Sequence, residues 1–162
     1  MLVAIIADTH LPRGSRTLPA ACVKRLRAAD MIIHAGDLTA KAVWQELCSY
    51  GEVLAIHGNA DEEPVRAALP AQLELELGGR PVAVIHDGGR RAGRLDRLRR
   101  RFPDADAVIF GHSHIPQHET GTDGFQIFNP GSPTDRRRSP RHTMGIAEID
   151  TWRLSFELIE LD

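Results

Sequence analysis

Short apolar, β-branched segments alternate with helical segments through the first two-thirds of the chain, and this alternation is the feature that most restricts its fold. Apolar runs at residues 2–7, 31–35 and 53–56 are predicted strands, and residues 18–29 and 40–50 between them have the spacing of amphipathic helices. Continuous apolar strands separated by helices are typical of a parallel sheet that helices cover. We therefore expect an α/β fold that begins with a β-α-β-α-β order.

The rest of the chain changes from this alternation to hairpins. The residues Gly78-Gly79-Arg80 predict a tight turn between strands at 73–77 and 81–85, and residues 94–102 predict a helix. Further strands are expected at 108–110, 117–120, 125–129, 143–149 and 153–159, and the part after residue 116 is expected to be antiparallel. This order favours two mixed β-sheets packed face to face and flanked by helices, a four-layer α-β-β-α sandwich.

Composition limits the class of protein. With 162 residues the chain is expected to form a single domain over 1–162, and its 42% hydrophobic and 26% charged content is that of an ordinary globular protein. A net charge of −2 gives no global field for nucleic acid or an anionic membrane. The apolar start is interrupted by Asp8 and is too short for a membrane segment. Cys22 and Cys48 lie in helical patterns, so we expect reduced thiols and a cytoplasmic location.

Polar side chains that bind metals gather where the predicted strands end. In open α/β sheets, ligands bind beyond the carboxyl ends of the strands. Five of these ends carry nitrogen or oxygen donors, namely Asp8, His10, Asp37, Asn59, His86, His112 and His114. If the chain is extended there, residues two apart point to the same side, so His112 and His114 would aim at one region. The sequence therefore predicts a metal site at this edge.

The number and type of donors indicate two metals. A donor set without thiolates suits divalent Mn, Fe, Zn or Ni. One catalytic metal typically takes about three protein ligands, so seven donors suggest two ions that share a bridging group. Asp37 is the best candidate for the bridge because it is the only carboxylate at its strand end. The neighbouring Gly36, Gly58 and Gly111 leave room for a turn close to an ion.

Each motif alone is common in proteins, but their order along the chain is not. The series Asp-X-His, Gly-Asp, Gly-Asn, a single His and Gly-His-X-His resembles the calcineurin-like metallophosphoesterase superfamily, and within it the small bacterial and archaeal phosphodiesterases. The resemblance covers nearly the whole chain and implies the metallo-dependent phosphatase fold. It also implies two metal sites that share Asp37. The first would be held by Asp8, His10, Asp37 and His114, and the second by Asp37, Asn59, His86 and His112.

The implied activity is hydrolysis of a phosphoester, with a phosphodiester as the expected substrate. Two divalent ions, expected to be Mn with Ni, Fe or Zn as alternatives, would bind the phosphate and lower the pKa of a bridging water, whose hydroxide attacks phosphorus. Asp37, Asn59 and His112 are the predicted catalytic residues, the last two also neutralising charge on the phosphoryl oxygens. The expected partner is a small phosphoester, with a homo-oligomer left open and with nucleic acid and membrane not expected. A binding scaffold of the same fold, as in a vacuolar trafficking subunit, and a nuclease are the alternatives.

One position departs from the pattern of the resembling phosphatases. They carry a histidine after the metal-binding asparagine, and that residue is thought to protonate the leaving group, whereas this chain has Ala60. The next residue, Asp61, has two equally supported interpretations. It orients a ligand imidazole, or it caps a helix that begins near Glu62.

Several further residues are weaker candidates. Arg90 and Arg91 follow His86 closely and are predicted to reach a substrate phosphate. Ser132 belongs to a loop, residues 129–133, that resembles one near the site in the family, although turn chemistry alone explains its Pro-Gly.

Other polar residues are assigned mainly to structure. His34 is expected in the core or beside a ligand, and His57 is a weak candidate for lining the site. Arg94, Arg97 and Arg101 are expected on the solvated face of their helix. For the run Arg136-Arg137-Arg138, anion binding and an oligomer contact are both left open.

Overall fold

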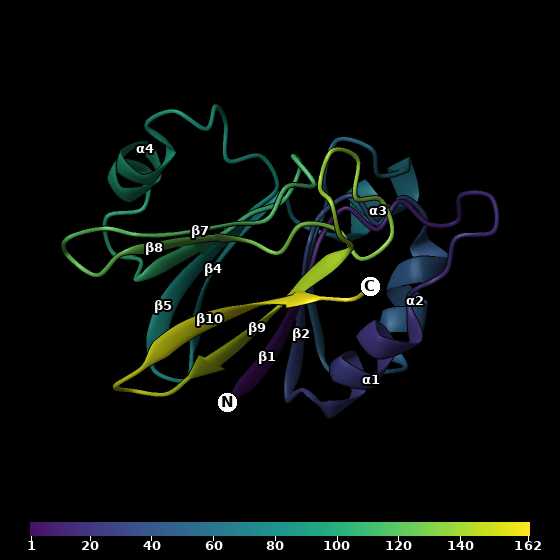
Figure 1. The fold of residues 1–162 in the computed structure, drawn as a ribbon, viewed down its shortest axis with the longest axis horizontal. Helices are drawn as coiled ribbons and strands as arrows, with labels where there is room; N and C mark the ends of the chain where they lie inside the picture. Colours follow the sequence, from purple (N-terminus) through teal and green to yellow (C-terminus); the bar gives the residue numbers. More distant parts are fainter.

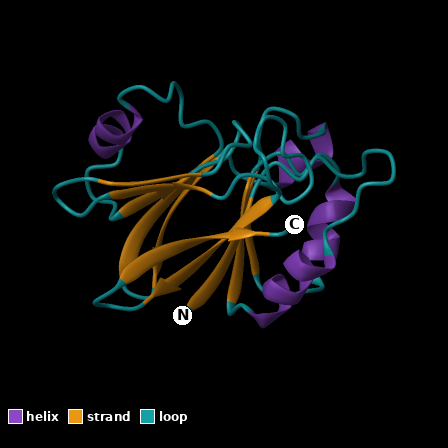
Figure 2. Cartoon of the chain, in the orientation of Figure 1, coloured by secondary structure: helices purple, strands orange, loops and turns teal.

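The computed structural model describes residues 1–162 as two five-stranded sheets packed face to face, with helices on both outer faces (Figures 1 and 2). The first sheet has the strand order β10-β9-β1-β2-β3 and the second the order β4-β5-β6-β8-β7. The strands of the first sheet are β1 (Leu2–Ile6), β2 (Met31–Ala35), β3 (Val53–Ile56), β9 (Thr143–Ile149) and β10 (Leu154–Glu160). Those of the second are β4 (Gln72–Leu77), β5 (Arg80–Ile85), β6 (Ala107–Ile109), β7 (Gln117–Thr120) and β8 (Gln126–Asn129). The four-layer prediction is confirmed.

The helices divide unequally between the two outer faces. Three of them, α1 (Ala20–Ala28), α2 (Lys41–Cys48) and α3 (Glu63–Ala68), lie beside the first sheet, and α4 (Arg94–Arg101) covers the second (Figure 1). None of these helices is long and apolar enough to cross a membrane.

Three apolar clusters fill the spaces between the four layers. Strand β1 illustrates the arrangement, because Val3 and Ile5 face the cluster between the sheets while Ala4 and Ile6 face the helices. A third cluster around Leu98 lies between α4 and the second sheet. Burial on both faces explains why the central strands are continuous apolar runs and do not alternate with polar residues.

The prediction of an antiparallel C-terminal part is wrong for one strand pair. Strand β8 is antiparallel to β7 but parallel to β6. The turn at residues 121–125 brings β8 back between β6 and β7, so that β7 becomes the edge of the sheet. Pairs β9–β10 and β1–β9 are antiparallel, as predicted.

The prediction of a solvated arginine face on α4 is wrong for Arg94. Its side chain is buried, and its guanidinium donates hydrogen bonds to the carbonyl of Gly89 and to the side chain of Gln117. It also lies 4.8 Å from the centre of the Phe110 ring. Arg94 is therefore a structural residue that ties the start of α4 to the loop after β5 and to β7, a packing that helical periodicity alone does not reveal.

Candidate metal centre

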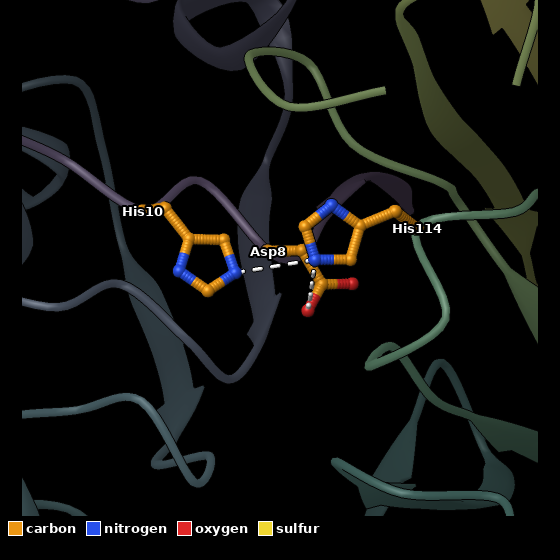
Figure 3. Close-up of side chains that lie close together, drawn as sticks. All are labelled: Asp8, His10 and His114. Atoms are coloured by element: carbon orange, nitrogen blue, oxygen red, sulfur yellow. Dashed lines mark hydrogen bonds and ion pairs between the residues drawn. The ribbon is translucent and has the colours of Figure 1, made fainter. Parts of the chain in front are cut away.

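Six of the predicted donors form two compact groups at the strand ends. Within each group, the donor atoms lie within 4.8 Å of one another. Group one consists of Asp8, His10 and His114 (Figure 3), and group two consists of Asp37, His86 and His112.

In group one the histidine nitrogens point inward (Figure 3). The Nε2 atoms of His10 and His114 are 3.2 Å apart, and the His114 Nε2 is 3.7 Å from the Asp8 Oδ1. The His114 Nδ1 donates to the carbonyl of Asp135, which can only accept, so the proton of the neutral ring is on Nδ1. Burial lowers the pKa of His114 to about 4, so the ring is neutral at neutral pH. Its Nε2 therefore offers a lone pair to the centre of the group.

Asp8 supplies the charge of group one. The side chain is fully buried, its Oδ1 accepts a hydrogen bond of 3.1 Å from the backbone N–H of His112, and its Oδ2 has no partner. Burial raises the pKa of Asp8 to about 7. A buried carboxylate oxygen without a partner is costly unless a cation is close, so a metal ion fits group one.

In group two a histidine is paired with the predicted bridge. The His86 Nε2 lies 3.2 Å from the Asp37 Oδ2, while its Nδ1 donates to the carbonyl of Ala35 at 2.8 Å. Burial alone would lower the pKa of His86, but the hydrogen bond and the charge of Asp37 raise it to about 9. Burial alone would raise the pKa of Asp37, but its bond to His86 contributes to holding it at about 2. The protonated His86 ring thus supplies the positive charge beside Asp37 that a metal ion would otherwise supply.

Asn59 joins group two through its amide oxygen. Its Oδ1 lies 3.2 Å from the His86 Nε2 and 3.0 Å from the His112 Nδ1. The donor atoms of these three residues therefore converge, and an oxygen and two imidazole nitrogens suit a borderline divalent ion.

Asp37 lies between the two groups. Its Oδ2 is 3.5 Å from the His10 Nε2 in group one and 3.2 Å from the His86 Nε2 in group two. Asp8 also approaches histidines of both groups, but at longer distances: its Oδ1 is 3.7 Å from the His114 Nε2 and 4.0 Å from the His86 Nε2. Of the two carboxylates, Asp37 therefore makes the shorter contacts with histidines of both groups.

The backbone at the donors is not extended, contrary to the expectation for His112 and His114. Five donors are non-glycine residues in the left-handed region, with φ of 56° at Asp8, 46° at His10, 60° at Asp37, 69° at His112 and 60° at His114. Each such residue kinks the chain just after its strand. The kinks send the imidazole of His112 into group two and that of His114 into group one.

Two glycines are required by close approach. A Cβ at Gly58 would lie 2.2 Å from the Asp37 Oδ1, and a Cβ at Gly36 would lie 2.6 Å from the His86 Nδ1. Gly36 also has a φ of 91°. Any side chain at these positions would displace a predicted ligand, in agreement with the sequence-based expectation.

Asp61 supports the ligand loops through their backbone, and neither an imidazole nor the start of α3 is its hydrogen-bond partner. The side chain is buried and contacts no imidazole, and α3 has no side-chain hydrogen bond at its N-cap residue, Glu62. Its Oδ2 accepts from the backbone N–H groups of Asp37 (3.0 Å) and Gly58 (2.6 Å), and its Oδ1 accepts from that of Thr39 (2.6 Å). Asp61 therefore fixes the backbone of two ligand loops.

Ser132 does not have the geometry of the predicted substrate contact. It is buried, and its hydroxyl donates to the carbonyl of Asp8 at 2.8 Å. It accepts from the backbone N–H groups of Thr134 and Asp135. The hydroxyl holds the loop after β8 against the end of β1, and this occupies its hydrogen-bonding capacity.

Neither Arg90 nor Arg91 lines the cavity beside group two. That cavity has a volume of about 430 Å³ and is lined by residues that include Asn59, His86 and His112. Arg91 instead borders a separate cavity of about 90 Å³. The arginines that line the larger cavity are Arg66 of α3 and Arg101 of α4, which the sequence analysis missed because their approach depends on how the two helices pack.

Two other histidines are placed near the site. His34 is buried, accepts a hydrogen bond at Nδ1 from the Gly36 N–H, and contacts the Thr9 hydroxyl through Nε2 at 3.0 Å. Burial lowers its pKa to about 3, so it is a neutral spacer between two ligand loops. His57 is half-buried and lines the cavity of group two.

Ala60 contributes only its backbone to the site. Its N–H donates to the Asp37 Oδ1 at 2.8 Å, and its methyl side chain offers no acid.

Solved structures with this fold cover essentially the whole chain. A Vps29 from Entamoeba histolytica, crystallised in complex with Zn²⁺, matches with a TM-score of 0.78 at 24% identity, over 100% of both chains. A protein described as a novel archaeal phosphodiesterase matches with a TM-score of 0.77 at 22% identity, over 99% of this chain and 100% of that one. At such identities the similarity establishes the fold alone.

Sequence relatives identify the family. A probable metallophosphoesterase of Methanocaldococcus jannaschii is 34% identical over 166 residues, which cover 100% of this chain and 82% of that protein. One of Methanothermobacter thermautotrophicus is 32% identical over 161 residues, 98% of this chain and 92% of that protein. The model of the calcineurin-like phosphoesterase superfamily domain matches residues 1–152. The chain therefore belongs to the calcineurin-like phosphoesterase superfamily, as the order of its motifs indicated.

Proposed function

We propose that this protein is a metal-dependent phosphodiesterase that uses two divalent ions, one at each donor group, with Asp37 between them. The observation that carries the proposal is the contact of one carboxylate with histidines of both groups, at 3.5 Å and 3.2 Å. The donors contain only nitrogen and oxygen, so we propose Mn²⁺, with Ni²⁺, Fe²⁺ or Zn²⁺ as alternatives. When bound, two such ions supply Lewis acidity at the phosphoryl oxygens and a nucleophile at neutral pH.

The side chains beside the cavity would position and stabilise the phosphate. The Oδ1 of Asn59 is directed at the histidines of group two, whereas its Nδ2 makes no hydrogen bond within the protein. This amide is therefore free to donate to a phosphoryl oxygen in the cavity. His112 is half-exposed beside it, so the same corner combines a metal donor with access to substrate.

The residues that follow Asn59 offer no general acid to protonate the leaving group. Ala60 places no imidazole where the resembling phosphatases have one, and both Asp61 oxygens are bonded to backbone N–H groups. The relatives named as metallophosphoesterases support an activity on phosphoesters in general. The preference for diesters is our own proposal and rests on the resemblance of the motif series to small bacterial and archaeal phosphodiesterases.

A protein-binding scaffold is the main rival, since Vps29 proteins share the fold. The completeness of both donor groups supports catalysis over a purely structural role. A nuclease is less well supported, because the chain has a net charge of −2 and no global field that would attract a duplex.

The first test compares hydrolysis of bis(p-nitrophenyl) phosphate with and without Mn²⁺, before and after treatment with a chelator. We expect activity that depends on Mn²⁺ and is lost in Asp37→Asn by about 10²–10³-fold, because the carboxylate charge shared by both ions is removed. Asp106→Asn, in an ion pair of 2.8 Å with Arg80, is the matched control and should retain activity. Metal binding without turnover of any phosphoester would favour the scaffold. Retained activity in Asp37→Asn with loss of one ion would exclude Asp37 as the bridge.

The second prediction assigns the two histidines of the Gly-His-Ser-His motif to different ions. His114→Ala should deplete mainly the ion of group one, and His112→Ala mainly that of group two, because their rings enter different groups. Elemental analysis of the purified, Mn²⁺-loaded variants gives the stoichiometry. His118→Ala, which removes an exposed hydrogen bond to Gln126, should keep the wild-type content. Two full equivalents in both His112→Ala and His114→Ala would contradict the assignment.

The third prediction concerns protons released on metal binding. In the metal-free protein the pKa of His86 is raised to about 9 and that of Asp8 to about 7, so both bind protons over a wider pH range than usual. A metal must displace these protons, so Mn²⁺ affinity should rise from pH 6 to pH 9. At pH 8 Asp8 is largely ionised, and we expect about one proton released per protein, mainly from His86. Calorimetric titrations in buffers of different ionisation enthalpy measure this number. A buffer-independent heat at pH 8 would contradict this prediction, since it would show that metal binding displaces no proton from His86.

The same shift has a consequence for the metal-free protein. Because the folded-state pKa of His86 lies above its ordinary value of 6.5, its pairing with Asp37 stabilises the fold fully below about pH 6.5. This contribution is lost as the pH rises through about 9.

The fourth prediction follows from Ala60. General acid catalysis typically contributes about 10²–10⁴-fold, so without an acid the rate should depend steeply on the pKa of the leaving group. Aryl diesters should be cleaved far better than alkyl diesters, and Ala60→His should help the poorest leaving groups most. The measurement is the rate against leaving-group pKa for both proteins. A shallow dependence in the wild type would mean that an acid is already present, for which His57 in the cavity wall is the candidate.

A further inference from the structure

A second cavity lies beside group one, between the loop from β1 to α1 and the loop from β8 to β9. It has a volume of about 530 Å³, within the range of small-molecule sites. Its wall includes Arg16, Thr134, Asp135, Arg136, Arg137 and His142. The cavity is distinct from the one beside group two, with which it shares no lining residue.

This cavity is held directly against group one. The carbonyl of Asp135, in its wall, accepts the hydrogen bond from the His114 Nδ1. The Thr134 hydroxyl, also in the wall, donates to the carbonyl of Thr9 at 2.6 Å, between two donors of group one. A ligand that occupies the cavity therefore lies at a defined position relative to a phosphate held at the metal centre.

The cavity carries an excess of positive charge. Arg16 is paired with Asp135 at 3.1 Å, and this is the only carboxylate in the wall. The guanidinium of Arg136 donates to the carbonyl of Ser139 at 3.0 Å and has no carboxylate partner. Arg137 is exposed and makes neither a side-chain hydrogen bond nor an ion pair. The wall therefore holds three guanidinium groups and one carboxylate, and that carboxylate also pairs with Arg13, outside the wall, at 3.8 Å.

Arg137 belongs to the loop that contacts group one. It follows two residues after Asp135, whose carbonyl accepts the hydrogen bond from the His114 Nδ1, and it lines the same wall. An unpaired guanidinium in a wall with two others is suited to a phosphate, which guanidinium groups bind through paired, charge-assisted hydrogen bonds.

We infer that this basic cavity binds a second phosphate of the substrate, so that the protein prefers phosphodiesters carrying a further phosphate group. The inference rests on the proposed phosphodiesterase function and names its substrate class. Arg137 is the principal contact because its donors are free, and Arg16 and Arg136 add charge from opposite loops.

The test uses two substrates with the same leaving group and the same scissile diester. They are thymidine 5′-(p-nitrophenyl phosphate) and its 3′-phosphorylated analogue, assayed with Mn²⁺. In the wild type we expect KM for the 3′-phosphorylated substrate to be lower by roughly tenfold, with similar kcat. Arg137→Asn should remove most of this difference and leave KM for the other substrate unchanged. Asparagine is chosen because Arg137 has a φ of 45°, which asparagine tolerates.

Arg138→Gln is the matched control, because it removes the same charge from the next residue, which does not line the cavity. It should retain the tenfold preference to within about twofold. A readout independent of turnover is calorimetric binding of thymidine 3′,5′-bisphosphate and thymidine 5′-monophosphate to Mn²⁺-loaded protein. Arg137→Asn should weaken binding of the bisphosphate alone.

The outcomes separate this inference from the proposed function. Hydrolysis of neither substrate under any metal condition would overturn the phosphodiesterase function itself. Hydrolysis of both with equal KM would overturn only the second phosphate site. An equal loss of preference in Arg137→Asn and Arg138→Gln would also overturn it, since it would point to a general surface charge.

Discussion

The position of the Asp37 carboxylate between two histidine groups is the constraint on which the rest of the site depends. Three features of the loop after β3 determine the position of this carboxylate. The backbone N–H of Ala60 donates to its Oδ1, Asp61 accepts the N–H of Asp37 itself, and the absence of a side chain at Gly58 leaves the space that its Oδ1 occupies. Each of these contacts comes from the loop after β3, so the second and third strands of one sheet cooperate to place one carboxylate.

The electrostatic states of the two groups differ in the absence of metal. In group two the protonated His86 ring balances the charge of Asp37, because Asp37 raises the pKa of His86 to about 9 although burial opposes this. Group one has no such cation, and burial raises the pKa of Asp8 to about 7. One group is a buried ion pair and the other a buried carboxyl close to its titration point. In both, the unfavourable burial of charge is what a divalent ion would relieve.

Much of this arrangement follows from the sequence because it depends on strand ends. The apolar runs located β1, β2, β3 and β6, and the residues after them were correctly expected at one edge. The left-handed backbone of His112 and His114 was not predicted, since an i, i+2 spacing says nothing about φ once a strand has ended. The roles of Asp61 and Arg94 were also missed. Both residues bond to backbone groups of loops that only the tertiary fold brings near, so no local pattern reveals them.

The two-sheet architecture explains how five metal donors keep a strained, left-handed backbone. Left-handed φ at a non-glycine residue costs on the order of 1–3 kcal/mol, and five donors bear it. Such strain survives only where the surroundings determine the conformation more strongly than the local preference does. Here the kinked residues lie two to five residues beyond the ends of strands whose side chains are almost fully buried, such as Ile6 and Ile109.

Each donor group also draws on both sheets. Group one combines residues after β1 with His114 after β6, and group two combines Asp37 after β2 with His86 after β5 and His112 after β6. The distances within each group are therefore set by how the sheets pack, through an apolar cluster that includes Ile5, Ile33 and Phe128. A densely packed interior resists sliding of one sheet over the other. The apolar core that stabilises the fold thus also maintains the distances between the metal donors.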